Sequence, residues 1–473
     1  MTLPWRLTNE LARMGRSSRP MAREPIRTAA VLRVPALAVR EGARAVGRRD
    51  EVRGVALREA WRAAWLSRAL VWAAGLAGVL ALGRVASWRS FDPAGLTAPF
   101  AGLGDLLVAP AARWDSTWYL AIASGGYHDA ARTAFFPLYP LLIRVVGAPA
   151  AAVGDPRAAY LLAGVAISLA ALPAGLYAVH RLTALELGPE TARTATWLVA
   201  LFPAGFAFSA IYTESLFLAL SAGAMLAGRQ GRWRWASALG ALAAATRSTG
   251  LLLVVPLALL YLYGPRADRP PPSSLRRGLA RLRPRHRAGA ELAWLALIPV
   301  GLLAYLGYLA LATGDPFAPF SAQAAWYRHF AGPLGGAWDG AVAAWDGMRQ
   351  LASGSRAHVY FAAAGGDPIR VALHNVGDFV FLAAAAAALV GAWRRLPAAY
   401  GAWALCAVAL PLSYPVGPEP LASLPRYLAV VFPLQMWLAA WARERRVDRL
   451  ALGASAALLA LLSAAFAAWQ WVA

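Results

Sequence analysis

Apolar stretches of roughly 20 residues recur along this chain, separated by polar or arginine-rich segments. A helix of that length spans the hydrocarbon core of a bilayer because its backbone polar groups pair within the segment. The pattern predicts an all-α polytopic membrane protein with about eleven transmembrane helices. Nine crossings are expected at 64–82, 158–181, 193–211, 214–228, 292–312, 371–393, 398–412, 427–441 and 450–471, and two short half-spans within 235–263.

The positions of the arginines between these stretches predict the orientation. Residues 1–63 are arginine-rich and lack the apolar core of a cleavable signal peptide, so we expect a cytoplasmic N-terminus in a multi-pass cell-membrane protein. We expect this segment to be disordered or loosely surface-bound rather than a basic amphipathic helix, and 64–473 to form one transmembrane domain. The arginine-rich linker 264–290 is then cytoplasmic, and two large loops, 83–157 and 314–370, face the outside.

Composition agrees with a membrane protein, at 59% hydrophobic residues and a mean hydropathy of +0.49. A net charge of +22 would indicate nucleic-acid binding on a soluble surface, but here the charge lies in loops between spans, so no nucleic-acid partner is expected. The single cysteine, Cys406, lies in an apolar run and can form no intrachain disulfide.

Four ionisable residues, Asp115, Glu214, Arg247 and Arg426, fall at membrane depth, where such groups are costly and mark function more often than in soluble proteins. Under the predicted topology all four map to the external half of the bundle. Asp115, between tryptophans, is either a general base or a helix N-cap.

The two arginines and the glutamate also allow two interpretations each. Arg247 lies between the half-spans of 235–263 and either presents its guanidinium to a phosphate or pairs with Glu214 as a buried bridge. Arg426 opens a span, so it either binds an anion or extends to the interface. Glu214 either orients an arginine or a sugar hydroxyl, or is a helix-start acid.

Motifs for metal, nucleotide or acyl-transfer chemistry are missing from the sequence. Tyr127-His128-Asp129 places two potential ligands side by side, but the six histidines are scattered, so neither a metal nor a cofactor is expected. Phosphate-binding loops, dinucleotide fingerprints and GxSxG elbows do not occur.

Five motifs follow one another along the chain: Trp114-Asp115, the run from Phe135 to Pro140, the stretch from Phe202 to Phe217 with Thr213-Glu214-Ser215, Thr246 to Gly250, and Leu424-Pro425-Arg426-Tyr427. Together and in this order they resemble the motifs of bacterial relatives of the PIG-V type (GPI mannosyltransferase 2-like) mannosyltransferases, which are GT-C glycosyltransferases. The resemblance extends over most of 64–441 and leaves out the N-terminal segment and the last span.

The resemblance implies a GT-C-like bundle that transfers a sugar, most often mannose, from a polyprenyl-phosphate donor to a lipid-linked or glycan acceptor at the extracytoplasmic membrane surface, among membrane lipids. It implies an inverting displacement with Asp115 as general base. Arg247 and Arg426 are then expected to stabilise the donor phosphate without a metal. Supporting or substrate-binding roles are expected for Trp114, Glu214, Tyr127, His128, Tyr139 and Tyr427, and acceptor-sugar contacts for Gln323, Trp326, Tyr327 and His329.

Two other functions remain open. A transporter or flippase of lipid-linked sugars predicts charges at the bilayer midplane and an internal repeat, whereas the charges here map near one side and no repeat is visible. A non-catalytic membrane partner predicts that Asp115 can be replaced without loss of activity.

Overall fold

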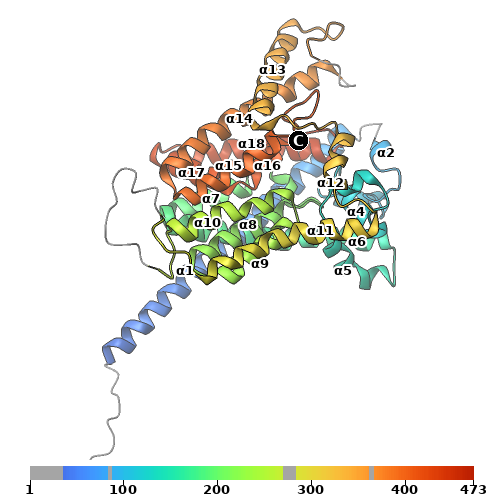
Figure 1. Cartoon of the computed structure of the whole chain (residues 1–473). Coiled ribbons are helices and arrows are strands. Elements are labelled where there is room, and N and C mark those ends of the chain that lie inside the picture. The colour runs from blue at the N-terminus through green and yellow to red at the C-terminus, as the bar shows by residue number, and fades with distance from the viewer. Residues whose placement is uncertain (1–35, 84–87, 270–283, 362–366, 473) are drawn as a thin grey trace, which may run out of the picture. The chain divides into compact units, whose positions relative to one another are not determined.

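The computed structural model describes residues 36–83, 88–269, 284–361 and 367–472; the regular structure in these ranges is helical, with two isolated bridges and with turns and loops between the helices (Figure 1). The chain divides after Val52, and the following account concerns the unit Arg53–Ala473. The first helix, α1, runs over Ala36–Leu82 and so includes residues 36–63 of the N-terminal segment. Alanine, leucine, glutamate and arginine, which favour helix, are frequent there; residues 1–35 fall outside the described residues. The disorder or loose surface contact expected for segment 1–63 stays a prediction.

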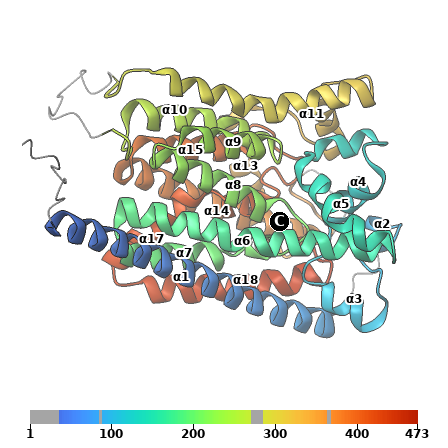
Figure 2. The same cartoon turned by 90° about the horizontal axis from the view of Figure 1, so that it is seen from below.

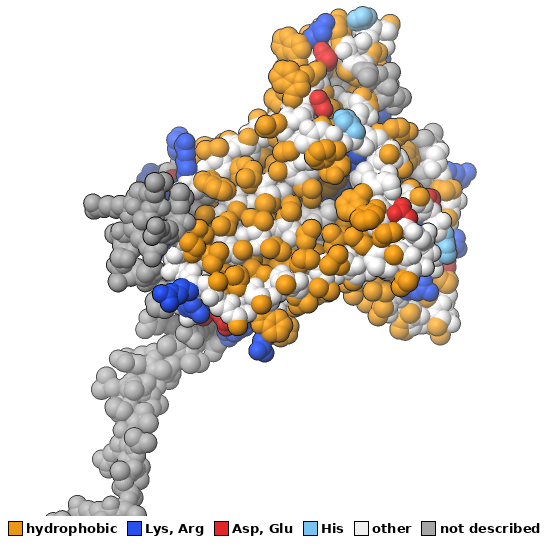
Figure 3. Space-filling view, viewed as in Figure 1, with side chains coloured by type: hydrophobic (Ala, Val, Ile, Leu, Met, Phe, Trp, Pro, Cys, Tyr) orange, Lys and Arg blue, Asp and Glu red, His pale blue; other side chains and the backbone are white. Residues whose placement is uncertain are grey.

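Five helical segments are long and apolar enough to cross a membrane: Glu51–Leu82 of α1, Pro156–Leu187 (α6), Ala290–Ala312 (η5 and α11), Pro368–Arg395 (α14) and Asp448–Ala467 (α18). Helix α6 packs against α5 (Leu138–Ala151), α7 (Pro189–Ala200) and α8 (Glu214–Arg229) (Figure 2). Only α6 is more than half buried in its most apolar window, at 56%; the others present most of that surface outward, as Figure 3 shows for one face. Apolar side chains that face outward along such helices fit a lipid environment, and the chain is a multi-pass membrane protein.

The remaining predicted crossings are shorter helices, below the roughly 20 residues that a full span needs. They are α7 (Pro189–Ala200), α8 (Glu214–Arg229), α9 (Trp233–Ala244), α10 (Val254–Tyr263), α15 (Ala398–Leu412) and α17 (Phe432–Glu444). The span predicted at 193–211 ends at Ala200, shortly before Pro203 and the 3-10 turn η2 (Gly205–Phe208). The span predicted at 427–441 is divided into α16 (Leu424–Ala429) and α17, which starts beside Pro433. In the described ranges, five segments have the length of a full crossing and the other predicted crossings are shorter helices, so the count of about eleven stays a prediction.

The predicted pair of half-spans within 235–263 is present. Helix α9 ends at Ala244, Arg247 is extended, and the chain continues through η3 (Ser248–Leu253) into α10. The break depends on Gly250, because a Cβ atom there would lie 2.2 Å from the carbonyl carbon of Ala243. This tight return places the Arg247 side chain beyond the end of α9.

Both large segments predicted as external loops contain helices. Segment 83–157 contains α2 (Trp88–Phe91), α3 (Gly102–Val108), α4 (Ser116–Gly125), η1 (Ala130–Ala134) and α5 (Leu138–Ala151), which gather at one end of the bundle (Figure 2). Segment 314–370 contains α12 (Ala318–Ser321), η6 (Ala322–Trp326) and the 22-residue α13 (Gly332–Ser353).

Helix α13 begins with Gly-Pro-Leu-Gly-Gly, a composition typical of loops. Its glycines serve close packing instead, since a Cβ atom at Gly336 would lie 1.8 Å from the carbonyl oxygen of Leu412 on α15. Tertiary contact with α14 and α15 therefore overrides low helix propensity.

Candidate active site

One cavity of about 920 Å³ is lined by residues from both segments predicted as external. Its wall includes Asp115 and Trp118 from the first segment and Trp326 and Arg328 from the second. Arg247, Arg426 and Tyr427 also line it, as do Trp469 and Trp471 near the C-terminus. The volume lies within the range that holds small-molecule and cofactor-sized ligands.

The turn that carries Asp115 has an unusual backbone. Trp114, directly before it, has a φ of 52°, in the left-handed region that costs a non-glycine residue energy. The turn is closed by the hydroxyl of Thr117, which donates to the Trp114 carbonyl at 2.8 Å. The Trp114 ring packs edge-on against Trp469 and Trp471, with centroids 5.6 and 5.1 Å away. These contacts from the end of the chain hold the strained residue in place.

Asp115 occupies the N-cap position of α4, but its side chain makes no capping hydrogen bond. Instead its Oδ2 accepts a hydrogen bond from Nη1 of Arg426 at 2.7 Å. The backbone N–H of Asp115 donates to the hydroxyl of Tyr212 at 3.3 Å. Among the described residues Oδ1 has no hydrogen-bond donor, so one carboxylate oxygen is held and the other is available to a ligand.

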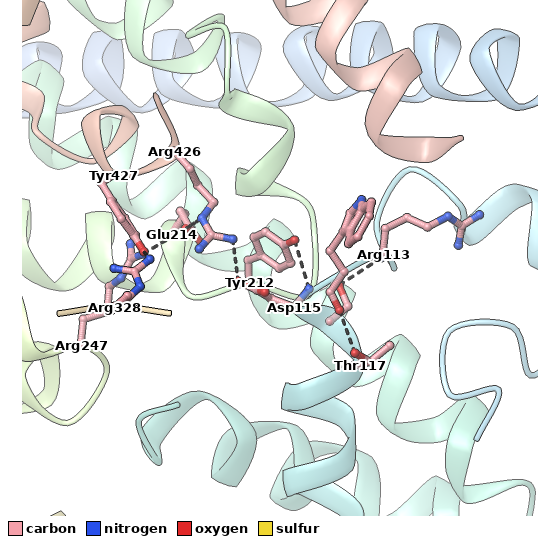
Figure 4. A network of polar contacts seen from close by, with 11 residues as sticks. Arg113, Asp115, Thr117, Tyr212, Glu214, Arg247, Arg328, Arg426 and Tyr427 are labelled. Atoms are coloured by element: carbon pink, nitrogen blue, oxygen red, sulfur yellow. Dashed lines mark hydrogen bonds and ion pairs between the residues drawn. The ribbon is translucent and has the colours of Figure 1, made fainter. Parts of the chain in front are cut away.

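Glu214, the first residue of α8, lies behind the cavity wall with 2% of its side chain exposed. Its Oε1 accepts a hydrogen bond from Nη2 of Arg247 at 3.2 Å. The Nε of Arg426 lies 3.2 Å from the same oxygen as a charge contact, although its N–H is not aligned for a hydrogen bond. Figure 4 shows the resulting row Asp115, Arg426, Glu214 and Arg247, in which acids and arginines alternate. The bridge between Arg247 and Glu214, one of the two alternatives from the sequence, is therefore present.

Tyr427 lies among three guanidinium groups. The carbons at the centres of those groups lie 5.2 Å (Arg247), 5.5 Å (Arg426) and 5.9 Å (Arg328) from its ring centroid, distances typical of cation–π contact. Its hydroxyl accepts a hydrogen bond from Nη2 of Arg328 at 3.0 Å. Tyr427 belongs to α16, outside the five long apolar helices; burial raises its pKa, but the charges of Arg328, Arg426 and Arg247 together lower it to about 8.

Three residues expected to support the site lie elsewhere and do not line the cavity: Tyr127, His128 and Tyr139. The Tyr127 hydroxyl donates to the Phe135 carbonyl at 2.9 Å. Tyr139 is fully buried, with its hydroxyl bonded to the Gly164 carbonyl at 2.9 Å and to Ser168. These two hydroxyl groups bond backbone carbonyls, and the supporting role expected for Tyr127, His128 and Tyr139 stays a prediction.

Of the expected acceptor-sugar contacts, Gln323, Trp326 and Tyr327 line the cavity and His329 does not. Four residues at the site escaped the sequence analysis: Tyr212, Arg328, Trp469 and Trp471. Tyr212 stands in the same motif as Glu214, and that proximity was the available signal. Arg328 is one arginine among many and adjoins aromatic residues that were noted. Trp469 and Trp471 were interpreted as the end of a membrane span, and only tertiary packing brings them to Trp114.

Asp129, from the Tyr127-His128-Asp129 motif, caps η1 by accepting from the backbone N–H of Ala131 at 2.9 Å. Within the described ranges no group of three or more histidine, cysteine, aspartate or glutamate side chains gathers in a way that would hold a metal ion. Four arginines line the cavity, Arg247, Arg328, Arg370 and Arg426, and guanidinium groups of this kind bind anions.

Comparison with known proteins finds similarity in the segment that carries Asp115, Glu214 and Arg247. The profile of a family described as Mannosyltransferase (PIG-V) matches residues 100–262. The chain is similar to GPI alpha-1,6-mannosyltransferase 2 of Mus musculus, 35% identical over 152 residues that make up 31% of this chain and 30% of the mouse protein. The Rattus norvegicus protein of the same name is 35% identical over 158 residues, 32% of each chain. No solved structure matches the chain.

The alignment thus spans about a third of the length of these curated relatives. Asp115, Glu214 and Arg247 lie inside the matched segment, whereas Arg328, Arg426 and Tyr427 lie beyond it. The match is narrower than the resemblance expected over 64–441. The two parts of the cavity wall are nevertheless joined by direct contacts, since Arg426 touches both Asp115 and Glu214.

Proposed function

We propose that this chain is a membrane mannosyltransferase of the PIG-V family, with a GT-C-like fold and a polyprenyl-phosphate sugar as donor. The acceptor is a hydroxyl group of a lipid-linked or glycan molecule. The observation that carries the proposal is the position of Asp115. It lies inside the segment similar to mannosyltransferases, lines a cavity of about 920 Å³, and has one carboxylate oxygen that receives no hydrogen bond from the described residues.

In the reaction we propose, Asp115 Oδ1 takes the proton of the acceptor hydroxyl group. The hydroxyl oxygen attacks the anomeric carbon of the sugar while the bond from that carbon to the phosphate oxygen breaks. The bonding electrons leave with the phosphate, so the donor's phosphodiester becomes a phosphate monoester with one additional negative charge. Attack from the face opposite the phosphate inverts the anomeric configuration in one step.

Arg426 and Arg247 stabilise that developing charge through the N–H groups that their carboxylate partners do not use. A guanidinium has five N–H donors, and the contacts to Asp115 and Glu214 occupy only part of each set. Donors fixed in advance stabilise a transition state without reorganisation, which is why they are effective in a partly desolvated site. Trp114 and Glu214 position the reacting side chains.

The membrane accounts for the rest of the architecture. A polyprenyl chain remains in the bilayer, so its phosphate arrives at headgroup depth and the reaction centre must lie there. The short helices α2 to α5 gather at one end of the long helices (Figure 2), and Asp115 directly precedes α4. We place this end on the extracytoplasmic side, opposite the arginine-rich linker, following the positive-inside rule.

The direct test is sugar transfer by purified protein in detergent, with polyprenyl-phosphate mannose and a lipid extract of the host. Wild type is expected to form a mannosylated product, and Asp115→Asn to lose about 10²-fold or more in rate while remaining folded. The matched control is Asp129→Asn, because Asp129 is a helix-capping carboxylate in the same segment. This variant should retain sugar-transfer activity.

The outcomes separate the alternative functions. Equal activity of wild type and Asp115→Asn would remove Asp115 from the reaction and leave the enzyme class standing. Failure of wild type to transfer from any polyprenyl-phosphate sugar would favour the transporter or the membrane partner.

A further inference from the structure

Arg426 and Arg247 are both paired with carboxylates at the site, so their positive charges are balanced. Arg426 is in contact with Asp115 and Glu214, and Arg247 is in contact with Glu214. These four side chains hold two positive and two negative charges, so the group as a whole is neutral. A phosphate diester that enters the cavity with one negative charge, and leaves the reaction with a second, needs a cation from another residue.

Arg328 is such a cation. It lies between η6 and α13 and lines the cavity. No ion pair between Arg328 and a carboxylate occurs in the part of the chain that the structure describes, and its side-chain hydrogen bond goes to the neutral hydroxyl of Tyr427. Its charge is therefore not cancelled by a neighbour, unlike those of Arg247 and Arg426.

The backbone around Arg328 fixes its position. Residues Arg328 and Val416 form an isolated antiparallel bridge, and the N–H of Gly417 donates to the Tyr327 carbonyl at 3.3 Å. The hydrogen bond to Tyr427 then fixes the guanidinium beside Arg247 and Arg426, as Figure 4 shows. A cation held in this way can bind an anion without first losing much side-chain freedom.

We propose that Arg328 binds the phosphate of the lipid-linked donor and supplies the positive charge that the Asp115, Arg426, Glu214 and Arg247 group lacks. This inference rests on the proposed function and adds a residue outside the segment that matches the family. In this arrangement Arg247 and Arg426 contribute hydrogen-bond donors, and Arg328 contributes the uncompensated charge.

Arg370 is the main competitor for this role, because it also lines the cavity and has no carboxylate ion pair among the described residues. It is exposed to solvent, and its charge acts on Asp367 three residues earlier in the chain. Solvent screens an exposed charge of this kind, so its effect on a ligand is weak. Arg370 therefore serves as the matched control.

Binding without turnover tests the proposal. Three ligands, polyprenyl phosphate, the uncharged polyprenol and inorganic phosphate, are titrated into wild type, Arg328→Gln, Arg328→Lys and Arg370→Gln, with quenching of tryptophan fluorescence as the readout. Wild type is expected to bind polyprenyl phosphate about tenfold or more tightly than polyprenol, as one charge-assisted hydrogen bond allows. That preference should disappear in Arg328→Gln and persist in Arg328→Lys and Arg370→Gln.

The results distinguish this inference from the proposed function. If wild type shows no preference for polyprenyl phosphate over polyprenol, the donor class itself is wrong. If wild type shows the preference and folded Arg328→Gln keeps it, the donor class stands and Arg328 is not its phosphate ligand. Tighter binding of polyprenyl phosphate than of inorganic phosphate assigns the site to a lipid phosphate, and equal binding would overturn that assignment in favour of free phosphate.

Discussion

Arg426 donates a hydrogen bond from Nη1 to Oδ2 of Asp115 at 2.7 Å, across 311 residues of sequence. The Nε atom of the same guanidinium lies 3.2 Å from Glu214 Oε1. One planar group therefore fixes the positions of the two carboxylates relative to each other. A lysine ammonium is a point charge with a different reach and cannot occupy both positions in this way.

Arg426→Lys should therefore lower kcat for sugar transfer about tenfold or more while the protein remains folded, because Asp115 loses the fork that orients it. Steady-state transfer rates measure this, with size-exclusion profiles as the check on folding. The matched control is Arg443→Lys, since Arg443 pairs with the exposed Glu190 at 3.5 Å far from the cavity wall. A kcat unchanged from wild type would mean that charge alone, without the planar fork, positions Asp115.

Glu214 should matter more for stability than for chemistry. With 2% of its side chain exposed, it is the common partner of Arg247 and Arg426. Glu214→Gln leaves Arg247 without a carboxylate partner and Arg426 with Asp115 alone, and breaking a buried ion pair in this way costs about 3–5 kcal/mol. Thermal unfolding in detergent should show a clear fall in melting temperature.

The double variant Glu214→Gln with Arg247→Gln removes one charge of each sign. It should recover part of the lost melting temperature, because a single arginine then remains opposite Asp115. If the double variant loses more melting temperature than the two single variants lose together, the pair is held by shape and not by charge.

The sequence identified the ionisable residues of this site more closely than it identified the bounds of the helices. Asp115, Arg247 and Arg426 were singled out because ionisable groups in apolar surroundings are costly, and the structure does bring them to one cavity. The bounds of individual helices differ from the prediction where tertiary contacts and prolines decide. Helix α13 forms in a glycine-rich segment because it packs on α14 and α15, and α7 ends at Ala200, before Pro203. A hydropathy pattern predicts neither the packing of α13 nor the early end of α7.

The position of Trp471 could not be predicted from the sequence. Its ring meets that of Trp114 edge-on with centroids 5.1 Å apart, yet 357 positions separate the two, and no local pattern could relate them. Trp471→Ala should release the strained Trp114 and loosen Asp115, which follows it. An aromatic pair is worth about 0.5–1.5 kcal/mol, so a fall in kcat of roughly two- to tenfold is expected with little change in donor KM. Trp338→Ala, on the outer face of α13 with 70% of its surface exposed, should leave kcat unchanged; a similar loss in both variants would point to general destabilisation.

The last prediction concerns pH. The three guanidinium groups lower the pKa of Tyr427 to about 8 from the ordinary value of 10.0, against the effect of burial. Below that value the hydroxyl is neutral and the cluster keeps its positive charge; above it, the phenolate cancels one positive charge at the place where we put the donor phosphate. Donor KM should therefore be flat at lower pH and rise by up to about tenfold for each pH unit above the pKa. In Tyr427→Phe, which cannot ionise, that rise should vanish even if KM near neutral pH is higher. A rise that persists in the phenylalanine variant would assign the titration to another group and separate Tyr427 from donor binding.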